Sequence, residues 1–443
     1  MVINSTAPGR KRWVVATITC VVIAGLIAIA LCNPRITRYV EGPTFRAELE
    51  KQTAKGLHFP ACQYAPIRRT GFLSAETERI TAADGRKAMT KVDAHGIRAR
   101  FNPLGVFLRR WQLDELHIDG AEVGIHVYEP KPEPSPAKPW YHVFLPDRVY
   151  LKRVWSEPAD VTWTLLEKKS GIFGTRLLIT PHGRDFEYQA TGGTMKVPHA
   201  PDLALHHTHM LITKTLFELY RLDLASGAGI IHGEGKAGMR DDKSVDFLVS
   251  CEKLPIREWV PASWKEHVAG TATGKAHWTG RDQKLENAYV TGAVRVNGGR
   301  IEGVEFLQVL AAITKRKSLE TIELEECSAE VEWEQDVGQV KNIAIESAGK
   351  FRIEGAVTLR KKSLGGALQL GATREYLDWL PKAEEVFTRE ANGYLWTEVH
   401  LSGTLDSPQQ DLSPRLLEAL KETPTSFLGA MFRALGEWLD GKK

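Results

Sequence analysis

An uncharged apolar run over residues 13–31 constrains this chain more than any other feature. The run of 19 residues begins at Trp13, passes through Val21 and Leu26, and ends at Leu31, with no proline inside it. A helix needs about 20 apolar residues to cross roughly 30 Å of hydrocarbon, and it pairs its own backbone groups there. The sequence therefore predicts one transmembrane helix over residues 13–31.

The charges beside this run indicate its orientation. Arg10, Lys11 and Arg12 stand directly before it, whereas Arg35 and Arg38 follow it and weaken the asymmetry. Short segments rich in Lys and Arg tend to stay in the cytoplasm. We therefore expect a cytoplasmic tail over residues 1–12 and the body of the chain on the opposite side of the membrane.

Two other fates of the N-terminus follow from the same residues. Ala28-Ile29-Ala30 has the small-x-small form of a signal-peptidase site, but the apolar run is longer than the usual 7–15 residues of a signal peptide. Retention of the helix is therefore favoured over cleavage. Leu31 is bulky where a lipoprotein signal has a small residue, which argues against lipid attachment at Cys32.

Composition excludes several classes of protein. The hydrophobic fraction of 43% and the charged fraction of 26% are typical of a folded chain, and a net charge of +3 gives no support for nucleic-acid binding. The five cysteines contain no CxxC pair and no regular spacing, so a zinc or disulfide framework is not expected. We expect no cofactor. A single disulfide among Cys62, Cys251 and Cys327 is possible, and the sequence does not determine which two would form it.

Period-two alternation is the main signal of the body. Residues 113–118 and 121–128 alternate apolar and polar side chains around Asp119-Gly120, which predicts a hairpin with its turn at that dipeptide. Alternation places all the apolar residues of a strand on one face. The expected lining of that face is Leu116, Ile118, Val123, Ile125 and Val127.

Similar strand-like segments recur to residue 401, with helical stretches between them. Helices are predicted over residues 45–55, 213–222, 304–315, 375–389 and 413–439. Residues 129–139 hold five prolines and predict an exposed loop, the best candidate for an internal boundary. The fold class is therefore mainly β with interspersed helices.

No motif predicts catalysis. The chain has no GxSxG, HExxH or P-loop sequence, and its paired acidic residues fit solvated surfaces. His206, His207 and His209 form the main histidine cluster, but a strand places His206 on the opposite face from the other two. We expect no catalytic residues, no metal ligands and no enzyme activity.

The C-terminal tail, residues 411–443, has an amphipathic pattern. Phe427, Met431, Phe432 and Trp438 recur at helical spacing. Such a helix could pack on the protein's own sheet, cover the open end of a groove, contact a partner, or lie at a membrane interface with Trp438 as its anchor.

The order of segments in the C-terminal half resembles that of a known family. Residues 270–280 lead to a strand, residues 297–303 precede a helical stretch, and strands follow up to 401–408, which read LSGTLDSP. This order is similar to the C-terminal region of AsmA-like proteins, the family that includes AsmA and TamB. Residues 111–123 resemble the early strand pair of that family, and the single N-terminal anchor also fits.

This resemblance implies a curved, elongated antiparallel β-groove that follows the N-terminal transmembrane helix and ends in C-terminal helices. At ~4.8 Å per strand, roughly 18–20 strands would give a groove on the order of 90 Å long. The implied domains are an N-terminal AsmA-like region over 40–128, a middle region over 140–260 and a C-terminal AsmA-like region over 261–410.

The resemblance also implies a function and a location. The chain would be a single-pass protein of the cell inner membrane, with its bulk in the periplasm. It would bind or conduct phospholipid in the cell envelope, with outer-membrane or envelope proteins as further partners. The main alternative is a scaffold or assembly factor for outer-membrane proteins that transports nothing, and a secreted hydrolase is a distant third.

Overall fold

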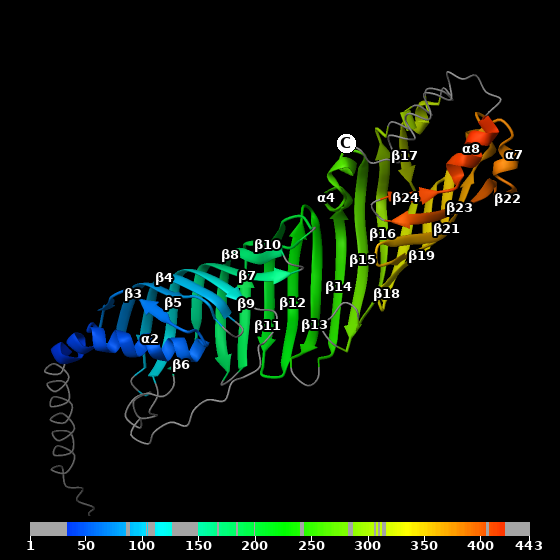
Figure 1. Ribbon diagram of the computed structural model, residues 1–443. Coiled ribbons are helices and arrows are strands. Elements are labelled where there is room, and N and C mark those ends of the chain that lie inside the picture. Colours follow the sequence, from blue (N-terminus) through cyan, green and yellow to red (C-terminus); the bar gives the residue numbers. More distant parts are fainter. Residues whose placement is uncertain are drawn as a thin grey trace, which may run out of the picture. The chain divides into compact units, whose positions relative to one another are not determined.

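The computed structural model describes residues 33–420, with short gaps (Figure 1). These gaps are residues 86–88, 103, 105–110, 126–148, 166–167, 183–184, 199, 240–242, 282–286, 305–306, 309–310, 312–315 and 405–406. The predicted transmembrane residues Trp13, Val21, Leu26 and Leu31 lie outside this part of the chain, as do Val127, the proline-rich residues 129–139, and Phe427, Met431, Phe432 and Trp438. Within the described residues, no helix combines the length and the apolar character needed to cross a membrane.

The protein is mainly β, as predicted, and divides into two compact units. Unit 1 covers residues 1–181 and unit 2 covers residues 182–443. In unit 1 the helix α2 (Pro43–Leu57) precedes the strands. Its strands are β1 (Cys62–Tyr64), β2 (Ile67–Arg69), β3 (Ser74–Ala82), β4 (Met89–Phe101), β5 (Trp111–Ile125), β6 (Val149–Leu151), β7 (Val154–Leu165) and β8 (Lys168–His182).

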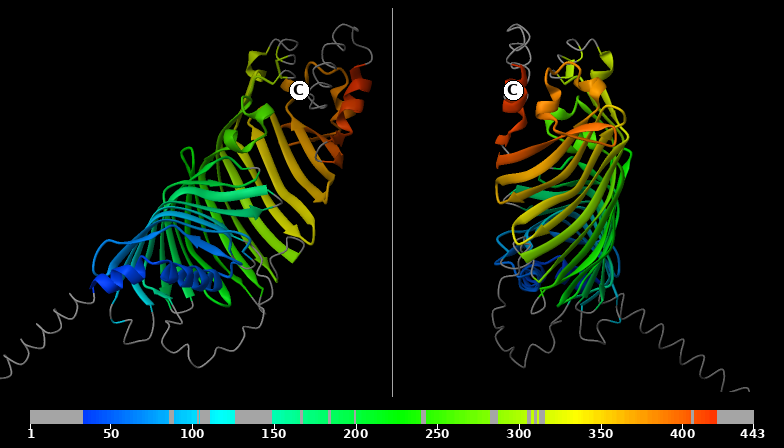
Figure 2. Two further views of the ribbon diagram at one scale, coloured as in Figure 1. Left: turned by 60° about the vertical axis from the view of Figure 1, so that its left-hand side comes forward. Right: turned by 90° about the vertical axis from the view of Figure 1, so that its right-hand side faces the viewer.

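Helix α2 confirms the helix predicted over residues 45–55. Pro43 at its first turn has its φ fixed at a helical value, and His58 ends the helix in the left-handed conformation. Phe45 and Ala54 of α2 are buried against the first strands. The helix therefore covers one face of β1–β4 (Figure 2).

The sheet of unit 1 is mixed, which corrects the expectation of a wholly antiparallel sheet. Strand β5 pairs in parallel with β6 and β7, whereas the pairs β1–β3, β2–β3, β3–β4, β4–β5 and β7–β8 are antiparallel. A parallel pair needs a connection of a dozen or more residues. Residues 126–148, between β5 and β6, supply that length.

The predicted hairpin turn at Asp119-Gly120 is wrong, because β5 runs unbroken through both residues. Opposite them, Gly96 has a φ of 60°, and Ala94 and Ile97 of β4 are both buried although they are three residues apart. The strands therefore bend at this level, and the apolar alternation shifts by one residue. Two alternating runs separated by two residues can thus form a single bent strand.

Unit 2 is built on antiparallel strands that pair mostly with their neighbours in sequence. They are β9 (Asp185–Thr191), β10 (Thr194–Lys196), β11 (Leu203–Ile212), β12 (Leu216–Ser226), β13 (Gly229–Gly238), β14 (Val245–Pro255), β15 (Val268–Gly280), β16 (Ala288–Glu302), β17 (Thr321–Leu324), β18 (Glu326–Glu334), β19 (Val337–Ser347), β20 (Phe351–Arg360), β21 (Ser363–Ala372), β22 (Arg389–Ala391), β23 (Tyr394–Thr404) and β24 (Ser407–Gln410). Its helices are α4 (Ile256–Trp259), α6 (Arg374–Leu377), α7 (Ala383–Val386) and α8 (Leu412–Leu420), with 3₁₀ turns at Ala262–Trp264 and Lys317–Leu319.

Two predicted helices of unit 2 are wrong. Residues 213–222 belong mostly to β12, because their apolar residues fit a three-residue step as well as alternation and the partner strands decide between the two. Residues 375–389 hold the two short helices α6 and α7 in place of one. Helix α8 confirms the start of the one predicted over 413–439, and Gln308 donates a helical hydrogen bond to the Val304 carbonyl within 304–315.

Candidate functional site: an apolar sheet face

The middle strands of unit 2 have one apolar face. Register pairs apolar residues directly across each neighbouring pair of strands, for example Phe247 with Trp278 and Val331 with Val340. We call the following set the apolar face: Ile231, Val245, Phe247, Val249, Cys251, Ala276, Trp278, Val290, Val294, Val296, Val331, Trp333, Val340, Ile345, Ile353, Val357, Leu359, Leu364, Leu368 and Leu370. It extends from β13 to β21.

The apolar face is open to solvent over the middle strands. Val249 is 41% exposed, Val294 36% and Val331 39%, although most apolar residues of a folded domain are buried. Among the residues that the structure describes, no helix of unit 2 crosses the middle of β14–β20 (Figure 2). Large exposed apolar patches on a soluble domain usually mark a site that binds something.

Aromatic rings lie flat on this face. A Cβ atom at Gly338 would come within 2.9 Å of the Trp333 ring across the strand pair, and one at Gly235 within 2.5 Å of the Phe247 ring. The Phe247 ring also lies 6.0 Å from the Trp278 ring. Because the glycines leave room for the rings, the aromatic residues add apolar surface without standing upright on the sheet.

The apolar face offers no polar partner to its own indoles. The indole nitrogens of Trp278 and Trp333 are buried, and neither has a hydrogen-bond partner among the residues that the structure describes. Burial also raises the pKa of the thiols of Cys251 and Cys327, which keeps both groups neutral at pH 7. Among the described residues, Cys62, Cys251 and Cys327 are all free, so no disulfide joins any two of them.

The opposite face of the same strands is charged. Asp246 accepts a hydrogen bond of 2.8 Å from His277, and Lys341 pairs with Glu332 on the next strands. Arg352 bonds with Glu354 at 2.6 Å. The hydrogen bond from Lys341 lowers the pKa of Glu332 below its usual value. The middle of unit 2 is thus an amphipathic sheet, with ion pairs on one side and hydrocarbon on the other.

The end of unit 2 is closed by helices. Ala372 and Leu395, at the end of β21 and the start of β23, are buried with Leu377, Val386 and Ala419 of α6, α7 and α8. Leu380 and Phe387 complete this buried cluster, which we call the terminal core. The apolar face therefore ends under a layer of short helices.

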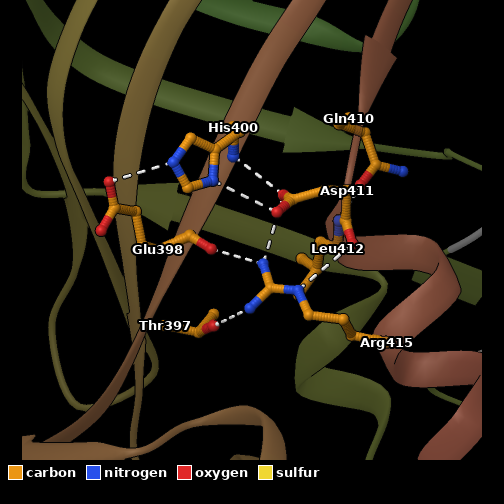
Figure 3. A network of polar contacts seen from close by, with 7 residues as sticks. All are labelled: Thr397, Glu398, His400, Gln410, Asp411, Leu412 and Arg415. Carbon is orange, nitrogen blue, oxygen red and sulfur yellow. Dashed lines mark hydrogen bonds and ion pairs between the residues drawn. The ribbon is translucent and has the colours of Figure 1, made fainter.

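The outer edge of β23 is closed by side chains (Figure 3). Between the short partners β22 and β24, residues 397–400 have no described strand on their outer side, whereas β21 pairs with them on the other side. There Asp411 accepts a hydrogen bond of 2.8 Å from the backbone nitrogen of His400, and Arg415 donates to the Glu398 carbonyl. Arg415 also donates to Thr397 Oγ1 at 2.9 Å. We call this contact the edge clasp.

The predicted lining residues lie in unit 1. Leu116 and Ile118 pair with Ala99 and Ile97 of β4, and Val123 pairs with Val92. Val92 packs against the buried cluster under α2, so this face of unit 1 is partly covered. Ile125 pairs with Met89, which packs against the same cluster, and Val127 lies outside the described residues. The open lining in unit 2 was missed, although its alternation is visible in the sequence.

One residue of the histidine cluster, His209, belongs to a small network of polar contacts. His209 contacts Glu187 Oε1 at 2.8 Å, and His182 contacts the other oxygen of the same carboxylate at 2.9 Å. The hydrogen bond with His182, followed by those with Gln189 and His209, lowers the pKa of Glu187. Among the residues that the structure describes, no group of three His, Cys, Asp or Glu side chains is arranged to hold a metal ion.

Unit 1 has a hollow of about 490 Å³ that is lined mainly by charged and polar side chains. Arg98 with Asp119 and Arg176 with Glu157 line it as ion pairs beside Trp155. The hydrogen bond from Arg176 lowers the pKa of Glu157. Each guanidinium here is already paired with a carboxylate, so this hollow resembles a solvated surface more than a reactive site.

No protein-family model, curated protein or solved structure matches this chain.

Proposed function

We propose that this chain is an AsmA-like envelope protein that holds phospholipid acyl chains on the apolar face of unit 2. In this proposal the strands form a curved, elongated groove, and the segment at residues 13–31 anchors the chain in the cell inner membrane with its bulk in the periplasm. The observation that carries the proposal is the exposure of Val249, Val294 and Val331 on a face that no described helix of unit 2 covers.

The size of the face suits an acyl chain. From β13 to β21 the sheet has seven inter-strand spacings, because β16 pairs directly with β18 and the short β17 adds none. At about 4.8 Å each, these spacings give roughly 34 Å. A bilayer's hydrocarbon core is about 30 Å thick, so the chains of one leaflet span roughly 15 Å. An acyl chain laid across the strands therefore fits within the apolar face.

The energetics favour reversible binding. Each methylene removed from water contributes about 0.8 kcal/mol, so a dozen contribute roughly 10 kcal/mol. Immobilising a ligand costs an estimated 4–15 kcal/mol, which offsets most of that gain. A face that releases what it binds suits movement of lipid along it. The charged opposite face keeps the sheet soluble.

The test compares two neighbouring residues of β14 that face opposite ways. Val249→Glu places a carboxylate on the apolar face, whereas Ser250→Glu places one beside His232 and Lys275 on the charged face. We expect phospholipid to co-purify with the full-length protein and to fall several-fold in Val249→Glu alone. Lipid extraction and mass spectrometry measure it.

The opposite result would favour the scaffold alternative. If no phospholipid accompanies the wild type, or if both variants retain the same amount, the apolar face does not hold lipid. A protein–protein role for the same face would then be the better explanation.

A further inference from the structure

One end of unit 1 exposes four large apolar side chains. Ile36 is 41% exposed, Tyr39 51%, Phe72 52% and Leu104 61%. Phe72 lies in the turn before β3, which begins at residue 74, and Leu104 follows β4, which ends at residue 101. Since β3 and β4 are antiparallel partners, these two residues are at the same end of the sheet. We call the four residues the apolar end.

Arg69 holds the parts of the apolar end together. Its Nη1 donates to Asn33 Oδ1 at 2.5 Å and to Thr37 Oγ1 at 2.8 Å, and its Nη2 donates to the Phe72 carbonyl at 2.8 Å. The guanidinium also lies 5.5 Å from the centre of the Phe72 ring. One side chain thus joins the helical residues 33–40 to the turn before β3.

A buried cluster supports this end from below. Phe45, Ile67 and Ala75 form it, and Val40 and Phe101 pack against it. The Tyr39 ring meets the Phe45 ring edge-on at 5.5 Å. The helical residues and the first strands that carry the apolar end therefore share a packed base.

The neighbouring charge and sequence indicate what covers it. Arg35 and Arg38 are exposed beside Ile36 and Tyr39. Residue 33 stands two positions after Leu31, the end of the apolar run, so a membrane span there leaves it within about 7 Å of the bilayer. Aromatic and apolar side chains with flanking arginines are typical of membrane interfaces.

We propose that the apolar end docks unit 1 on the surface of a bilayer that contains anionic phospholipid. The contact adds a second attachment beside the anchor and fixes how unit 1 stands on the membrane. This inference rests on the membrane-anchored part of the proposed function and not on lipid binding by the apolar face of unit 2.

The experiment uses full-length protein reconstituted in vesicles of phosphatidylethanolamine and phosphatidylglycerol. A photoreactive benzoylphenylalanine replaces Phe72 in one sample and Tyr220 in another. Tyr220 is a matched control, an exposed aromatic residue of unit 2 at 44% exposure. We expect about tenfold more phospholipid adduct at position 72, as for an apolar side chain moved from water into lipid.

A charge variant tests the headgroup. Arg35→Glu with Arg38→Glu should lower the adduct at position 72 in vesicles with phosphatidylglycerol and leave it unchanged in vesicles of phosphatidylcholine alone. Equal adduct at positions 72 and 220 would overturn the docking.

A third probe at Val331 separates this inference from the proposed function. Adduct at position 331 without adduct at 72 defeats the docking and keeps lipid on the apolar face. Adduct at 72 without adduct at 331 does the reverse. Release of the whole protein from the vesicles by alkaline extraction would defeat the anchor, and with it the premise on which the docking rests.

Discussion

The middle strands of unit 2 and its C-terminal end have the same alternating pattern but different surroundings. In the middle, Val331 is 39% exposed, whereas Leu395 of the terminal core is 4% exposed under α6, α7 and α8. The strands are alike, so the difference comes from the helices that follow them. Alternation alone therefore fixes which side of a strand is apolar and leaves open whether anything covers it.

The largest expected effect separates the two regions directly. Leu395→Ala should lower the free energy of unfolding by about 2–5 kcal/mol, because it opens a cavity in the terminal core. Val331→Ala should change it by less than about 1 kcal/mol, because its side chain already meets solvent. Hydrogen exchange of β18 and β23 in the full chain measures both. Equal losses would mean that the middle is covered like the end.

The next effect concerns the flat rings of the middle strands. Gly338→Leu should destabilise β18–β19 by about 1–3 kcal/mol, because the new side chain displaces the Trp333 ring. Gly365→Leu is the matched control, since a Cβ atom there has nothing within 4 Å. Exchange protection of the two strand pairs measures the difference. If Gly365→Leu is as costly, the loss comes from glycine replacement and not from the ring.

The smallest effect is the pH dependence of the edge clasp. Burial raises the pKa of Asp411, but hydrogen bonds from the His400 backbone and ring, with Arg415, outweigh it and hold that pKa below its usual 3.8. A lowered folded pKa means that the clasp contributes stability above pH 3.8 and loses it as the pH falls through the folded value.

Asp411→Ala should therefore cost up to about 1 kcal/mol at pH 7, and nothing at a pH below the folded value, because the side chain is partly exposed. Urea unfolding of wild type and variant at both pH values checks this. A cost that persists unchanged in acid would show that the carboxylate charge is not what holds the clasp.

The sequence predicted the strand-rich fold because alternation is local. The prediction was wrong where residues far apart in the chain determine how strands pair or continue. The parallel pairing of β5 with β7 depends on a connection of more than 20 residues, and the continuity of β5 through Asp119-Gly120 depends on the bend at Gly96 of β4. The apolar spacing within β12 fits a helix as well as a strand, and its pairing with β11 and β13 decides for the strand.

The candidate site was predictable in kind but not in place. The apolar residues of a strand can be predicted from the sequence, as the lining residues of β5 show. What covers these residues could not be predicted, because α2 packs near that face of unit 1 while no helix in the described part of unit 2 lies over its middle strands. The packing of an aromatic ring over a glycine could not be predicted from the sequence either. Phe247 and Gly235 are 12 positions apart in the chain and meet only because β13 pairs with β14.

The edge clasp limits where strands could be added to a sheet of this kind. Asp411 and Arg415 occupy the backbone groups through which another strand would join β23, and α8 is fixed to the terminal core beside them. In the middle of unit 2, by contrast, consecutive strands such as β18–β19, β19–β20 and β20–β21 pair as antiparallel hairpins, and the same unit repeats along the sheet. A longer or shorter version of this protein would therefore arise by gain or loss of whole hairpins between β14 and β21, while the finished end is inherited unchanged.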